Sequence, residues 1–263
     1  MKKVIILALI VIATSSIVAQ EKSEQLYLLF EFMQVDDHNG SDYWEIEDFW
    51  SEIHKQRIAD NSILGWDLWQ LTPSGSKQGS QFMTTTLFNS LEAMLQGMPG
   101  DKFNEYLQKA HPDKSKNELD AMMEKTVLSR DMAHQVFAKE ISTTDDEFEM
   151  KVGTVMTMDI MKQVKDSYVK MENEIFKPWH QEQVDNGKKG NWGLVQIILP
   201  TGSEAYASHF TYSMFENLEQ LTTSMESWEG GDMDLTTELA VQEGFKTREW
   251  KELKIARLVM MVR

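Results

Sequence analysis

Residues 54–71, HKQRIADNSILGWDLWQL, recur in altered form as residues 180–197, HQEQVDNGKKGNWGLVQI. The two stretches align without a gap at an offset of 126 (180 − 54). The aligned pairs that keep the same residue include His54/His180, Trp66/Trp192, Leu68/Leu194 and Gln70/Gln196. Beyond them the offset becomes 127, and the matched residues are Pro73/Pro200, Gly75/Gly202 and Ser76/Ser203. This pattern predicts two copies of one structural unit.

Apolar periodicity around the repeat predicts the order β-α-β-β-α-β in each copy. In the first copy the predicted elements are a strand at 26–35, a helix at 41–60, strands at 65–72 and 80–88, a helix capped by Asn89, a helical excursion at 101–128 and a strand at 131–141. In the second copy they are a strand at 153–164, a helix at 167–183 that restarts at Pro178, strands at 191–199 and 205–215, a helix capped by Asn217, a helical piece at 235–243 and a strand at 250–262.

A β-α-β-β-α-β unit forms a four-stranded antiparallel sheet with both helices on one face. The other face is also largely apolar, so two units can bury those faces against each other, sheet to sheet. The polar, acidic stretch STTDDEFEMK (142–151) marks the connection. We expect an α+β fold with a first unit at 20–142, a linker at 143–151 and a second unit at 152–263.

At this point the chain resembles the dimeric α+β barrel superfamily of ferredoxin-like domains. The motifs are a helix with an apolar stripe, a strand that starts Gly-Trp or Asn-Trp, a Pro-x-Gly-Ser turn, and Phe-x-x-Leu-Glu entering the second helix. They cover most of residues 26–263, in two copies. The resemblance includes the antibiotic-biosynthesis-monooxygenase-like, NIPSNAP-like and chlorite-dismutase-like proteins, and it implies a tandem duplicate that forms the barrel within one chain. Because the motifs are structural and such proteins range from oxygenases to haem proteins and binding modules, the resemblance assigns no catalytic residue or cofactor.

The N-terminus predicts export. Lys2 and Lys3 precede an apolar run at 4–12 and small residues up to Ala19, as in a secretory signal peptide at 1–19. The alternative is an N-terminal membrane anchor, but the run is shorter than the ~20 residues that a spanning helix needs. We expect cleavage near Ala19 and a periplasmic or extracellular protein without a membrane partner.

Composition excludes several partners and sites. The formal net charge is −16, and loss of two lysines with the signal peptide makes it −18 (−16 − 2). An acidic surface repels nucleic-acid phosphates, so no nucleic-acid partner is expected. The chain has no cysteine, which excludes disulfides, thiolate metal sites and cysteine nucleophiles.

The recurring histidines are the leading site candidates. His54 lies at the edge of the apolar helix stripe formed by Ile46, Phe49, Trp50 and Ile53, where a side chain can serve proton transfer or ligand binding. The alternative is a histidine that caps the helix end. We predict that His54 and Trp66 flank one cleft on the helix side of the sheet, with Arg57 holding an acidic ligand group.

The aligned second-copy candidates are His180, Trp192 and Gln196, and Gln70 completes the first set. The tryptophans and glutamines alternate along their strands, which is equally compatible with interior packing. Gln183 replaces Arg57 and Lys189-Gly190 replaces Ile63-Leu64, so we expect one working pocket, in the first half.

Other motifs favour ordinary structural roles. Arg130 and Arg248 are expected to pair with surface carboxylates rather than with an anionic ligand. His-Pro-Asp (111–113) matches the J-domain tripeptide, but a proline stop and a Ser115…Glu118 capping box explain it. Met156, Met158 and Met161 cannot converge on one ion from a regular strand, and no metal site is predicted.

Two function classes remain. One is a small-molecule binding protein, including a cofactor-light monooxygenase-like enzyme, with its pocket between the first helix and the sheet. The other is a non-catalytic interaction module outside the cytoplasm. Ligand and cofactor stay unknown, and the chain is expected to be a monomeric pseudo-dimer or a homodimer.

Overall fold

The computed structural model describes residues 25–35, 40–75, 77–226 and 233–263. The predicted signal peptide lies outside these residues. Within the described ranges, no helix is both long and apolar enough to cross a membrane.

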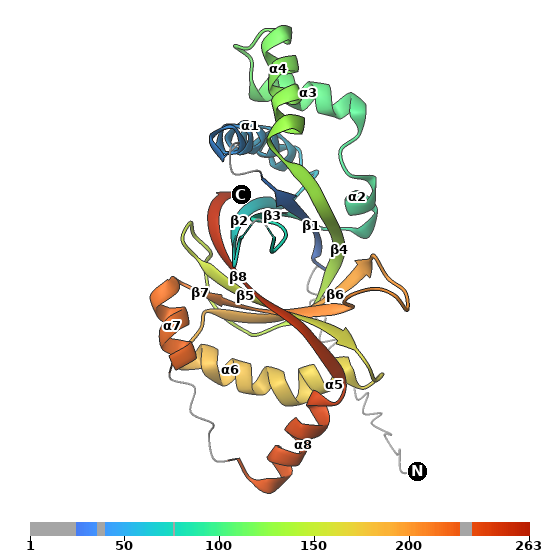
Figure 1. Cartoon of the computed structure of the whole chain (residues 1–263), viewed down its shortest axis with the longest axis vertical. Coiled ribbons are helices and arrows are strands. Elements are labelled where there is room, and N and C mark those ends of the chain that lie inside the picture. The colour runs from blue at the N-terminus through green and yellow to red at the C-terminus, as the bar shows by residue number, and fades with distance from the viewer. Residues whose placement is uncertain (1–24, 36–39, 76, 227–232) are drawn as a thin grey trace, which may run out of the picture.

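The described residues form one closed barrel of antiparallel strands (Figure 1), in the order β1-β3-β2-β8-β5-β7-β6-β4. The strands are β1 (Tyr27–Gln34), β2 (Gly65–Thr72), β3 (Phe82–Phe88), β4 (Asp131–Thr143), β5 (Val155–Gln163), β6 (Asn191–Leu199), β7 (His209–Phe215) and β8 (Arg248–Val262). The predicted order of elements is confirmed in both halves, and β2 and β6 have the predicted bounds.

Each half contributes four neighbouring strands, β4-β1-β3-β2 and β8-β5-β7-β6. The two sheets do not only face each other as expected. They also pair edge to edge, because β8 hydrogen-bonds to β2 and β4 hydrogen-bonds to β6. The long strands β4 and β8 supply the reach for these seams, and closure leaves no unpaired sheet edge.

Helices cover the outside of the barrel on opposite sides (Figure 1). In the first half they are α1 (Gly40–Ala59), α2 (Leu91–Gln96), α3 (Gly100–Ala110) and α4 (Lys116–Ser129). In the second half they are α5 (Tyr168–Met171), the π-helical turn η1 (Glu172–Phe176), α6 (Lys177–Asp185), α7 (Leu218–Glu226) and α8 (Leu235–Phe245). The pieces α5, η1 and α6 follow one another without a break and correspond to α1.

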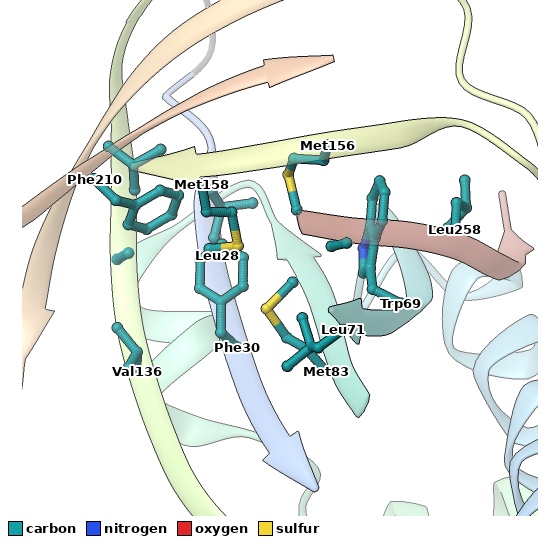
Figure 2. Close-up of a cluster of buried hydrophobic side chains, with 13 residues drawn as sticks. Leu28, Phe30, Trp69, Leu71, Met83, Val136, Met156, Met158, Phe210 and Leu258 are labelled. Atoms are coloured by element: carbon teal, nitrogen blue, oxygen red, sulfur yellow. The ribbon is translucent and has the colours of Figure 1, made fainter. Parts of the chain in front are cut away.

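Inward-facing side chains from all eight strands fill the barrel lumen (Figure 2). The buried members are Leu28, Phe30, Trp69, Leu71, Met83, Val136, Ala138, Met156, Met158, Val195, Phe210, Ala256 and Leu258. Because side chains alternate along a strand, the next residues face the helices instead. Met161 accordingly lies in a different cluster from Met156 and Met158, as predicted.

Several predicted boundaries need correction. Ser90, not Asn89, caps α2, because its hydroxyl accepts from the Ala93 amide. Strand β7 begins at His209 rather than at 205. Strand β4 continues to Thr143, since pairing with β6 holds it in extended form past the predicted linker boundary.

Candidate functional site

The candidate site in the first half lies between α1 and the outer face of β2. Trp66 and Leu68 face the helix, whereas Trp69 faces the lumen. From the last turns of α1, His54 lays its ring on the Trp66 indole, with centroids 4.9 Å apart and planes at 19°. Both side chains are buried, at 7% and 1% exposure. The structure therefore brings together the two residues that the repeat singled out.

Arg57 determines the tautomer and the charge state of His54. One turn further along α1, its Nη1 lies 3.2 Å from His54 Nδ1. A guanidinium has only donors, so Nδ1 must accept and His54 is neutral with its proton on Nε2. Burial, and then the Arg57 charge, keep the pKa of His54 well below its ordinary value. The ring is thus a fixed hydrogen-bond donor through Nε2.

The second half repeats this arrangement. His180 stacks on Trp192, with centroids 4.7 Å apart and planes at 14°. Its Nδ1 lies 3.1 Å from Lys189 Nζ, and burial together with the Lys189 charge lowers its pKa well below the ordinary value. Lys189 comes from the loop between α6 and β6, not from the helix. The sequence comparison noted Lys189 opposite Ile63 but did not predict that it reaches His180.

The glutamines do not join these stacks. Gln70 is exposed and Gln196 is only half-buried, and both lie further along their strands than the tryptophans. The expectation of a pocket in the first half alone rested on two differences: Lys189-Gly190 replaces Ile63-Leu64, and Gln183 replaces Arg57, so an equivalent of the Arg57 cation is missing. Because Lys189 supplies a cation at the same ring atom, that ground for asymmetry does not hold.

Each long helix carries one buried ion pair in its N-terminal half. Arg130 pairs with Glu47 on α1, and Arg248 pairs with Glu172 in η1. The two glutamates are 1% and 2% exposed, so the prediction that these arginines pair with surface carboxylates is wrong. A tyrosine one helical turn before each glutamate, Tyr43 or Tyr168, is fully buried beside its pair. The recurring Tyr-x-x-x-Glu, 125 positions apart (172 − 47), was the sequence signal for these pairs.

Charges link the ion pair and the histidine in the second half. Asp159 on β5 interacts with both Lys189 and Arg248. Burial lowers the pKa of Lys189 from 10.5 to about 8, opposed by Asp159. Burial raises the pKa of Glu172 from 4.5 to about 7, opposed by Arg248. This layer therefore holds groups that change charge near neutral pH.

Coverage by other helices distinguishes the two halves. The α3–α4 hairpin packs on α1, where Tyr106, Leu107 and Leu119 cover Phe49 and Ile53. Tyr106 also donates to Asp60 at 2.5 Å and lies 3.2 Å from Ser62 Oγ, which ties down the α1–β2 loop. In the second half α8 instead packs on η1, with Phe245 against Phe176. His180 consequently remains half-buried, while His54 is sealed.

Two surface hollows lie away from the stacks. One, of about 330 Å³, lies between α7 and the loop that carries Lys189, and is lined by Gly187, Lys188, Asn217, Glu219, Gln220, Thr223 and Ser224. The other, of about 450 Å³, lies in the α3–α4 hairpin beside His111. Only the first adjoins a candidate site, one residue away from Lys189.

The His-Pro-Asp motif has a structural role. The His111 ring stacks on Phe49 at 4.1 Å, and its Nε2 lies 3.1 Å from the Phe49 carbonyl oxygen. The Ser115–Glu118 capping box that starts α4 is confirmed. This loop therefore fastens the hairpin to α1. Within the described residues, no three histidine, aspartate or glutamate side chains are placed to hold a metal ion.

No protein-family model and no curated protein matches the chain. Among solved structures, a candidate monooxygenase from Fusobacterium nucleatum subsp. nucleatum is similar, with a TM-score of 0.56, 8% identity and coverage of 91% of this chain and 94% of that one. An anthrone oxidase-like protein has a TM-score of 0.53 and 12% identity, covering 92% and 94%. A candidate monooxygenase from Lactobacillus acidophilus has a TM-score of 0.51 and 12% identity, covering 91% and 96%. At these identities the likeness shows the fold alone.

Proposed function

We propose that the protein binds a small organic molecule on the helix side of its barrel, at the second-half site formed by His180, Trp192 and Lys189. The observation that carries the proposal is the neutral histidine, stacked on a tryptophan and contacted by a cation at Nδ1. The first-half set of His54, Trp66 and Arg57 has the same arrangement, but it is buried, and Trp50 contacts both the His54 ring and Phe103 of α3. In the second half His180 is only half-buried, which leaves part of its ring accessible to a ligand.

The donors at this site favour an anionic or anion-forming ligand. His180 Nε2 donates a hydrogen bond, and Lys189 places a positive charge beside it. Hydrogen bonds from such donors to an oxyanion are stronger than those between neutral groups. The indole of Trp192 adds a flat apolar surface. A small aromatic molecule with an ionisable hydroxyl or carboxyl group fits these features.

A monooxygenase-like reaction is the activity most compatible with this chemistry. Donors preorganised around a developing enolate or phenolate stabilise it, and such electron-rich anions are the forms that an oxidant attacks. One structural neighbour is named anthrone oxidase-like, and anthrone is an enolisable ketone whose enol is a phenol. We therefore choose anthrone as the first probe.

The test combines binding and turnover. Anthrone is titrated into the full mature protein, while tryptophan fluorescence and oxygen uptake are followed. His180→Gln should weaken binding about tenfold or more, because a charge-assisted hydrogen bond contributes roughly 1.5–3 kcal/mol. His134→Gln, at an exposed position on β4, is the matched control and should bind normally. Equal binding by both variants would refute the site, and binding without oxygen uptake would leave a binding protein.

An interaction module is the second candidate. Its supporting observation is the exposed apolar group at the junction of α4 and β4, where Val127, Leu128 and Met132 are 74%, 68% and 50% exposed. Mass spectrometry of ligands retained on the native protein separates the two functions. A retained small molecule supports the binding site, and an empty protein that forms a stable complex through this surface supports the module.

We also infer that the two halves arose by duplication of one ferredoxin-like unit and that the protein is exported. The matched residues occupy matching strands, and Lys2, Lys3 and the apolar run fit a signal peptide. Expression with the native N-terminus in a bacterium should give a periplasmic or secreted protein shortened near Ala19. Recovery of an uncleaved cytoplasmic protein would contradict the export proposal.

A further inference from the structure

Apart from Asp67 Oδ1, which is ion-paired with Arg263, two polar side-chain atoms inside the barrel have no hydrogen-bond partner among the described residues. They are Trp69 Nε1 on β2 and Thr85 Oγ1 on β3, in side chains that are 2% and 6% exposed. Trp69 belongs to the lumen cluster (Figure 2), and Thr85 alternates with Met83 of the same cluster. Since buried polar groups are nearly always hydrogen-bonded, an unpartnered pair on one wall points to a guest.

The Asp67 carboxylate lies beside these two atoms, and we call Asp67, Trp69 and Thr85 together the lumen patch. Asp67 lies directly opposite Thr85 in the β2–β3 register, two residues before Trp69 on the same face of β2. Cross-strand neighbours and diagonal neighbours lie within reach of one small group. The wall at Asp67, Trp69 and Thr85 therefore offers one N–H donor, one hydroxyl and one carboxylate acceptor to the same region of the lumen.

The patch lies close to solvent. Asp67 pairs with Arg263 at 2.8 Å, and the Arg263 side chain is 39% exposed. That side chain runs over Gly65, where an added Cβ would lie 2.6 Å from Nη1. A glycine at this position thus leaves room for the arginine to cover the strand start. A partly exposed ion pair therefore covers the Asp67 end of the patch.

The equivalent wall in the second half is satisfied internally. There Tyr212 takes the place of Thr85 and lies over Gly193, the counterpart of Asp67. The Tyr212 hydroxyl donates to Glu140 at 2.6 Å. The second half therefore supplies its own phenol and carboxylate at the wall where the first half has unpartnered polar atoms.

We propose that this patch binds the hydroxyl group of an apolar alcohol or phenol. The ligand oxygen accepts from Trp69 Nε1, its hydrogen is donated to Asp67, and the Thr85 hydroxyl completes the set. The apolar body enters the lumen among Met83, Met156 and Met158, whose unbranched side chains can rearrange around a guest. The guest copies the tyrosine–carboxylate contact of the second half, and the proposal is independent of the helix-side site.

Phenol is the probe, and the indole N–H resonances of the ¹⁵N-labelled full mature protein are the readout. Trp69 is assigned by the signal that Trp69→Phe removes, and Trp192 reports the helix-side site separately. Phenol should shift the Trp69 signal saturably and bind at least tenfold more tightly than toluene, which lacks the hydroxyl. Thr85→Val should weaken phenol binding about tenfold, as expected for one lost hydrogen bond.

Thr84→Val is the matched control, because Thr84 is equally buried but faces the helices and bonds to Glu31. It should leave the response of Trp69 to phenol unchanged. The proposal would be overturned if phenol left the Trp69 signal unmoved or if toluene bound with equal affinity. It would also be overturned if magnetisation passed from the Trp69 N–H to water and not to added phenol, because water would then be the partner of this group. A Thr85→Val protein that is more thermostable and still binds phenol normally would overturn it as well.

Discussion

The two halves place a cation at the same atom of a stacked histidine but draw it from different positions in the chain. In the first half Arg57 reaches back one turn along α1 to His54. In the second half Lys189 reaches across from the loop before β6 to His180. The contact between a cation and histidine Nδ1 is therefore kept in both halves, although Arg57 aligns with Gln183 and Lys189 aligns with Ile63, neither of which is basic. An alignment of positions therefore underestimates how alike the two sites are.

The halves differ more in what covers the site than in the site itself. The excursion before the last strand is longer in the first half and forms the α3–α4 hairpin over α1. In the second half α8 instead packs against η1, with Phe245 on Phe176. The same arrangement is thus a sealed structural element in one half and an accessible one in the other.

The largest change in stability is expected when a buried ion pair is broken, and it shows whether both halves depend equally on these pairs. Arg130→Met and Arg248→Met each leave a buried carboxylate unpaired and should lower the free energy of unfolding by about 3–5 kcal/mol. Because burial raises the pKa of Glu172 to about 7, the Arg248→Met loss should be smaller at pH 6 than at pH 8. Urea unfolding at both pH values measures these losses.

The controls are a matched surface arginine and a compensated pair. Arg257→Met removes an exposed arginine from β8 and should change stability by less than about 0.5 kcal/mol. Arg130→Met combined with Glu47→Leu should recover most of the loss, because no charge is left buried. An Arg130→Met protein as stable as its parent would show that the first-half pair is not needed.

A smaller, pH-dependent effect should distinguish Lys189 from Arg57. The folded-state pKa of Lys189, about 8, lies below its ordinary value of 10.5, so the unfolded chain binds more protons between these values. Stability therefore rises with pH across this window. Relative to Lys189→Met, the parent should gain on the order of 2–3 kcal/mol from pH 8 to 10.5.

Arg57→Met provides the comparison, because a guanidinium stays charged throughout this range. Its stability difference from the parent should stay flat with pH. If Lys189→Met also gives a flat difference, Lys189 is not held in the buried environment described above.

The smallest effect is expected from moving the cation within the first half. Arg57→Gln alone removes the partner of His54 and should cost about 1–2 kcal/mol. Arg57→Gln with Ile63→Lys copies the second-half arrangement and should regain part of this loss. Ile63→Lys alone should be the least stable of the three, since it buries a second cation beside Arg57. A double variant no better than Arg57→Gln would mean that the two positions are not interchangeable, as judged by a double-mutant cycle.

Much of the fold could be predicted from the sequence, because strands and helices are marked by the spacing of apolar residues and by the residues that form turns and caps. Strands β2 and β6 and the Asn217 cap on Gln220 were predicted correctly. The change in the offset between the two copies, from 125 to 126 residues, also has a structural cause. The first two matched pairs, Tyr43/Tyr168 and Glu47/Glu172, are 125 apart, and the π-helical turn η1 inserts one residue before His180.

The rest depended on contacts between distant elements. Closure of the barrel requires β8 to pair with β2, and no local pattern specifies that partner. Likewise, Lys189 and Glu172 look like ordinary surface residues until folding buries them at 7% and 2% exposure. The candidate histidine–tryptophan pairs could be predicted because the repeat marked them, whereas their cations and their cover could not.

The central claim is that both halves hold a neutral histidine of the same tautomer. Long-range ¹H–¹⁵N correlation spectra of the imidazole rings measure this directly in the full mature protein. At pH 6, His54 and His180 should both carry one proton, on Nε2, because their pKa values lie well below 6.5. A proton on Nδ1 of either ring, or a doubly protonated ring at that pH, would contradict the claim.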